Sequence, residues 1–152
     1  MGTRLSYFCA TFVFTMPFFV TPNSEAGEKL QACSSKQARA AETVVGTAHS
    51  WKELYKQYQQ FEHCDDGAIA EGFSESVSML LDEKWKEINT LSRIAKRNAQ
   101  FRTFILRHID ETVPSDRLSR INSNATNRCP RNIRSLCVEI NNAAQQAIER
   151  SS

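Results

Sequence analysis

Residues 64–81 read CDDGAIAEGFSESVSMLL, and this stretch decides the fold class. Its apolar side chains recur at the spacing of one helix face, at Ile69, Phe73, Val77, Leu80 and Leu81. An acid pair, Asp65 and Asp66, stands just before them, where a helix N-cap is expected. The stretch therefore predicts an amphipathic helix that begins after the acid pair.

Apolar stripes of the same period occur on both sides of this stretch, and each covers one helix face. They are Leu30, Cys33, Ala41, Val44 and Val45; Trp51, Leu54, Tyr55, Tyr58 and Phe61; Ile88, Leu91, Ile94 and Ala95; Phe101, Phe104, Ile105 and Ile109; and Ile133, Leu136, Cys137, Ile140, Ala144, Ala147 and Ile148. Sustained alternation of period two is not found. We expect an all-α fold, a compact bundle of roughly six short amphipathic helices.

Three helix starts can be read from local signals. Ser50 followed by Glu53 is a capping-box pattern at the head of the Trp51 stripe. Ser115 is a candidate N-cap for a shorter helix after Pro114, and Pro130 suits the first turn of the last helix. With 152 residues, of which 41% are hydrophobic and 24% charged, the chain is long enough for one folded domain.

The first 26 residues predict a signal peptide. Arg4 gives a positive start, residues 5–20 are uncharged and rich in phenylalanine, and small residues precede Gly27. A membrane anchor is the alternative, but a span needs about 20 apolar residues. We expect cleavage near Ala26, a periplasmic product, and a single helical domain over residues 27–152.

The cysteines agree with export. Without Cys9 in the apolar segment, Cys33, Cys64, Cys129 and Cys137 remain, and an even count in an exported chain indicates two disulfides. A zinc site is the alternative, but no CxxC pair occurs. If residues 131–137 were helical, the rise of about 9 Å would disfavour a Cys129–Cys137 bond. Two long-range pairings then remain.

Charge is segregated along the chain. Residues 62–87 carry eight acidic residues and two lysines, whereas residues 93–134 carry ten basic and three acidic residues. Either the two segments attract each other within the fold, or they form poles that recognise a charged protein partner. The arginines are dispersed and lack interleaved aromatic residues, so no nucleic-acid partner is expected.

Candidate catalytic groups are sparse. The histidines are His49, His63 and His108, and no nucleophile-elbow, zinc-protease or nucleotide-binding motif is present. We interpret His108 as a cation at a helix C-terminus, and Glu71 with Glu75 as surface carboxylates. The sequence therefore predicts a protein without enzymatic activity, cofactor or metal.

The residue 64–81 stretch also carries a family resemblance. Its opening cysteine, its Asp-Gly-Ala-Ile core and its apolar helix resemble the periplasmic immunity proteins that protect bacteria against type VI secretion amidase effectors. Residues 127–129, followed by an amphipathic helix, look like the second cysteine segment of that family. The resemblance covers roughly residues 60–145, and Cys33 and Cys137 are not part of the pattern.

The resemblance implies an inhibitor. It implies that the partner is a cognate peptidoglycan amidase, whose catalytic cleft the protein plugs, and that the immunity protein is a homodimer. It also implies a Cys64–Cys129 disulfide, which leaves Cys33 to pair with Cys137. A periplasmic chaperone or adaptor for another client is the alternative function, and a small hydrolase is a further one.

The expected toxin contacts lie in two places. In the resembled family a loop between the later helices enters the active site, and the matching turn here has a proline and a valine that we expect to face solvent. The outer face of the residue 68–84 helix, with Ser78 and Asp82 beside its glutamates, is a possible second contact. The candidate residues are Asp110, Glu111, Thr112, Val113, Ser115, Asp116, Glu71 and Glu75.

Overall fold

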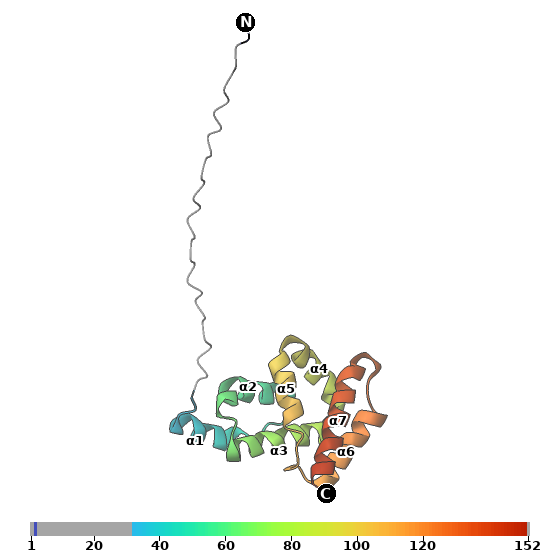
Figure 1. Ribbon diagram of the computed structural model, residues 1–152. Coiled ribbons are helices and arrows are strands. Elements are labelled where there is room, and N and C mark those ends of the chain that lie inside the picture. Colours follow the sequence, from blue (N-terminus) through green and yellow to red (C-terminus); the bar gives the residue numbers. More distant parts are fainter. Residues whose placement is uncertain (1, 3–31, 152) are drawn as a thin grey trace.

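The computed structural model describes Gly2 and residues 32–151, and Figure 1 shows their arrangement. Apart from Gly2, the expected signal peptide lies outside the described residues, so its cleavage near Ala26 stays a prediction. Within the described part, no helix is both long and apolar enough to cross a membrane.

The described chain is all helical, as the stripes predict, with no strand among residues 32–151. The α-helices are α1 (Ser35–Val44), α2 (Trp51–Phe61), α3 (Gly67–Glu83), α4 (Ile88–Arg97), α5 (Ala99–Arg107), α6 (Ser115–Asn127) and α7 (Arg134–Arg150). Short 3-10 turns are η1 (Glu62–Cys64), η2 (Trp85–Glu87) and η3 (Arg131–Ile133). One buried cluster of side chains unites these helices into a single core.

Helix α3 runs along the base of the molecule beneath α2 and α5, and α6 lies beside α7 at one end (Figure 1). Aromatic rings join the three central helices. The ring centroids of Phe104 lie 4.8 Å from Tyr58 and 4.9 Å from Phe73. Such contacts add about 0.5–1.5 kcal/mol each beyond the area they bury.

Several helix starts follow their local sequence signals. Ser50 accepts a hydrogen bond from the Glu53 N–H, and the Glu53 carboxylate accepts one from the His49 N–H at 2.8 Å. Asp66, the N-cap of α3, accepts from the Gly67 N–H at 2.8 Å. The expectation for Ser115 is wrong: Pro114 is the N-cap of α6, and no side chain caps that helix.

Two disulfides are present, but with different partners from those expected. Cys33 pairs with Cys64, with Cα atoms 4.9 Å apart, and Cys129 pairs with Cys137 at 6.1 Å. The prediction of Cys64–Cys129 with Cys33–Cys137 is therefore wrong. Its geometric premise was a continuous helix from Arg131. Instead Pro130 is extended (φ −63°, ψ 139°) and one 3-10 turn precedes α7, so the chain folds back toward Cys137.

Candidate acidic pocket

A cavity of about 290 Å³ lies where three segments meet: the start of α3, the end of α5 and the loop between α5 and α6. We call it the acidic pocket, and it is lined by Asp65, Asp66, Ala70, Glu71, Ser74, Arg107, His108, Asp110 and Thr112. Eight of its nine lining residues are polar or charged. Four carboxylates face one guanidinium and one imidazole, so its net charge is negative.

A buried hydrogen-bond network closes the inner wall of the pocket. Ser74 Oγ donates to Asp110 Oδ2 at 2.7 Å and lies 3.0 Å from His108 Nδ1. On the far side of the ring, His108 Nε2 lies 3.1 Å from Asp65 Oδ2, which also pairs with Arg107. Residues 34 to 43 positions apart in sequence are thus fixed to one another.

The network holds the ring of His108 at both nitrogens. A hydroxyl has one proton, and the Ser74 proton goes to Asp110, so Nδ1 of His108 must donate to Ser74 Oγ. Nε2 faces the Asp65 carboxylate, so the buried ring bridges Ser74 and Asp65. The expectation of a simple helix-terminal cation for His108 misses this buried role.

The order Ser74, His108, Asp65 has the connectivity of a hydrolase triad, but its chemistry differs. In a triad the histidine takes the serine proton, whereas here that proton goes to Asp110. The Ser74 side chain is also only 2% exposed. These contacts hold the start of α3 against the loop after α5.

Asp110 is the charged anchor of that loop. Its burial alone would raise the pKa of the carboxyl group, but hydrogen bonds from Thr112 and Ser74, together with the nearby His108 charge, outweigh burial and lower the pKa below its ordinary value. The Thr112 N–H and hydroxyl donate to Asp110 Oδ1 at 2.9 and 2.5 Å. These hydrogen bonds constrain the loop at Asp110 and Thr112.

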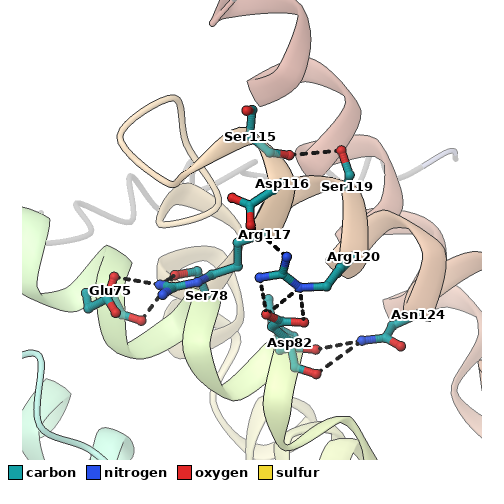
Figure 2. Close-up of polar contacts among 10 residues, drawn as sticks. Glu75, Ser78, Asp82, Ser115, Asp116, Arg117, Ser119, Arg120 and Asn124 are labelled. Carbon is teal, nitrogen blue, oxygen red and sulfur yellow. Dashed lines mark hydrogen bonds and ion pairs between the residues drawn. The ribbon is translucent and has the colours of Figure 1, made fainter.

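Three of the expected contact residues, Glu71, Asp110 and Thr112, meet at the acidic pocket. Glu75 does not, because its carboxylate pairs with Arg117 of α6 at 2.6 Å. Figure 2 shows this pair and the similar contact of Asp82 with Arg120. The expectation of a free outer face on α3 is thus wrong for Glu75, Asp82 and Ser78, and the acidic and basic segments do attract each other within the fold.

The structure also differs from the expectation for the loop before α6, the segment expected to enter the toxin's active site. Val113 is 4% exposed and belongs to the core, so the expectation that it faces solvent is wrong. Glu111 is exposed but pairs with Arg150 of α7 at 2.8 Å, and Asp116 pairs with Arg120 at 2.7 Å. Ser115 is exposed at the start of α6. The accessible part of the loop is polar.

Sequence reasoning missed Asp65, Ser74, Arg107 and His108 as members of one site. Their contacts bridge segments that have no shared periodicity, so no local pattern links them. Two chemical signals were available in the sequence. His108 lies two residues before Asp110 at a helix end, and Ser74 lies on the helix that follows the acid pair.

No metal-binding group of three or more suitable side chains occurs in the described part of the chain. Comparison with family models, curated proteins and solved structures finds no match to this chain.

Proposed function

We propose that this chain is an exported binding protein that neutralises a cognate cell-wall amidase toxin of a type VI secretion system by occluding its active-site cleft, and that it meets the toxin with the acidic pocket and its rim. The observation that carries the proposal is the convergence of Glu71, Asp110 and Thr112 on that pocket. The two disulfides are in keeping with an oxidising compartment.

The pocket has charge available for a partner. Glu71 is exposed and makes no ion pair within the described residues, whereas the Asp65 carboxylate is held inside with Oδ1 lacking a hydrogen-bond partner. The negative charge of the pocket, with Glu71 at its exposed rim, suits a cationic side chain of the partner. The neighbouring loop is already ordered by Asp110, so little conformational entropy is lost when it is bound.

The exposed carboxylates of the pocket provide the test. The double variant Asp66→Asn, Glu71→Gln should inhibit the cognate amidase about tenfold more weakly than the wild type, or about 1.4 kcal/mol. Asparagine is as good an N-cap as aspartate, so α3 should keep its start. Inhibition is measured as release of peptide fragments from peptidoglycan against inhibitor concentration, with the wild type reaching completion at one equivalent.

The matched control is Glu87→Gln, Glu149→Gln, which changes the net charge equally at two exposed residues outside the pocket. It should inhibit like the wild type. Equal inhibition by the pocket variant would remove the pocket from the contact surface. Failure of the wild-type protein to inhibit the amidase would reject the toxin and favour a chaperone or adaptor with another client.

A small hydrolase is the less favoured alternative, because the Ser74 proton goes to Asp110 and Ser74 is 2% exposed. Release of fragments from peptidoglycan by this chain alone, lost in Ser74→Ala, would establish it. A homodimer also belongs to the proposal. Val138 is 58% exposed and is the large apolar side chain exposed in the described part. It is the first residue to replace when a dimer contact is tested, with the mass of the protein measured by light scattering.

A further inference from the structure

A second concave site lies between α2 and α4 and has the opposite charge. It is a groove of about 200 Å³ lined by Lys52, Tyr55, Thr90, Arg93, Ile94 and Arg97. We call it the basic groove. It shares no lining residue with the acidic pocket.

The cations of the basic groove are not neutralised. No described carboxylate forms an ion pair with Lys52, Arg93 or Arg97. Of the nine other arginines in the described part, five pair with carboxylates (Arg102, Arg107, Arg117, Arg120 and Arg150) and four do not. The contact that Arg93 makes is a hydrogen bond from Nη2 to Thr90 Oγ1 at 3.0 Å, which leaves its charge uncompensated.

Helix stability explains only part of this cluster. Arg97 lies in the last turn of α4, where a cation is favoured by the helix dipole. Lys52 lies in the first turn of α2, where the dipole is already positive and a cation is disfavoured.

The walls of the groove indicate what kind of anion it takes. Tyr55 and Ile94 are half-buried and give it an apolar side between the cations. A carboxylate on a short aliphatic stem matches both surfaces, since the stem packs on the apolar wall and the carboxylate reaches the guanidinium groups. We propose that the basic groove binds the acidic side chains of a partner polypeptide.

An anionic lipid surface fits the groove less well. The site is concave, whereas a stable interfacial anchor combines basic residues with exposed apolar side chains that enter the lipid. Val138 is the exposed large apolar residue of the described part, and it lies on α7, away from the lining of the groove. The inference goes beyond the proposed function and does not depend on the amidase.

The test uses a defined probe: a tetrapeptide with two central glutamates between glycines, blocked at both ends. We expect it to shift the backbone amide resonances of the first turn of α2 and of residues 90–97 in a saturable manner when titrated into the purified, isotope-labelled protein. The peptide with glutamine in place of glutamate should leave these resonances unchanged. Equal shifts by both peptides would overturn the proposal.

The variant Arg93→Gln, Arg97→Gln should weaken peptide binding about fivefold or more, because two charge contacts are lost. The matched control Lys36→Gln, Arg39→Gln removes the same charge from exposed residues of α1 and should bind like the wild type. Equal weakening in both variants would show a general charge effect and reject the groove.

Two further arms separate the possible outcomes. The first arm uses vesicles containing phosphatidylglycerol. If the vesicles bind the protein through Arg93 and Arg97 while the peptide does not bind, the polypeptide proposal is overturned and the occupant is a membrane surface. The acidic-pocket variant Asp66→Asn, Glu71→Gln should bind the glutamate peptide normally. Failure of the wild-type protein to inhibit the amidase, with intact peptide binding, would reject the proposed function while the groove assignment holds.

Discussion

Replacing Cys33 and Cys64 together with alanine should lower the free energy of unfolding by about 3.5 kcal/mol. This bond links positions 31 residues apart, and the entropy that a disulfide removes from the unfolded chain grows with the loop it closes. The Cys129→Ala, Cys137→Ala variant should lose less, about 2.5 kcal/mol, since its separation is 8 residues. Urea denaturation of the three oxidised proteins measures both differences.

The same experiment checks the pairing itself. Each double variant should keep its remaining bond, so fragments from digestion without reductant should show Cys129 linked to Cys137 in the first variant and Cys33 linked to Cys64 in the second. A Cys64–Cys129 fragment from the wild type would contradict the structure. The observed pairing also places the Cys33–Cys64 bond directly before Asp65, so it anchors one wall of the acidic pocket.

Asp110→Asn should lower the free energy of unfolding by about 2–3 kcal/mol at neutral pH. Asp110 accepts hydrogen bonds at both oxygens, from Ser74 on one side and Thr112 on the other. An asparagine side chain has one acceptor oxygen, so its amide group must face donors on one of these sides. It also removes the negative charge near His108. The exposed neighbour Glu111→Gln is the control and should cost much less, because its ion pair with Arg150 is exposed to solvent.

The effect of Asp110→Asn should depend on pH in a defined direction. The folded-state pKa of Asp110 lies below its ordinary value of 3.8, so its contribution is fully present above that value and is lost as pH falls through the folded-state pKa. The stability difference between wild type and variant should therefore be constant at moderately acidic pH and shrink below about pH 4. A difference that grows on acidification would show that the carboxyl group is not ionised in the folded protein.

The fold class could be predicted because each helix carries its own pattern. The apolar stripes, the N-cap role of Ser50 and the acid pair before α3 are local features, and local chemistry decides them. The disulfide pairing was not predictable in the same way. Pro130 is compatible with a helix first turn and with an extended residue, and the structure has the extended form followed by η3.

The outer face of α3 shows a second limit. Ser74, Ser76 and Ser78 are polar in sequence yet at most 2% exposed. Ser76 accepts a hydrogen bond from the Ala48 N–H, and Ser78 donates to the Glu75 carbonyl, so burial leaves these hydroxyls with partners. A helix covered by α6 on its polar side cannot be recognised from apolar periodicity, because the covering contacts are ion pairs.

Among the candidate contacts, the acidic residues of the loop and of α3 could be proposed from charge alone. Their accessibility could not, because it depends on which arginine reaches each of them. Glu71 stays without an ion-pair partner while Glu75, one turn later, meets Arg117. Val113 is buried because the Val113 N–H bonds back to the Asp110 carbonyl, a turn that directs the side chain into the core.

The order of the disulfides has a consequence for how the chain matures. Each bond joins cysteines that follow one another in the described sequence, Cys33 with Cys64 and Cys129 with Cys137. If the chain enters an oxidising compartment from its N-terminal end, Cys33 enters before Cys64, and Cys137 enters soon after Cys129. The native bonds are then the first that can form. We therefore expect oxidative folding in such a compartment to require an oxidant but no isomerase to exchange mispaired bonds.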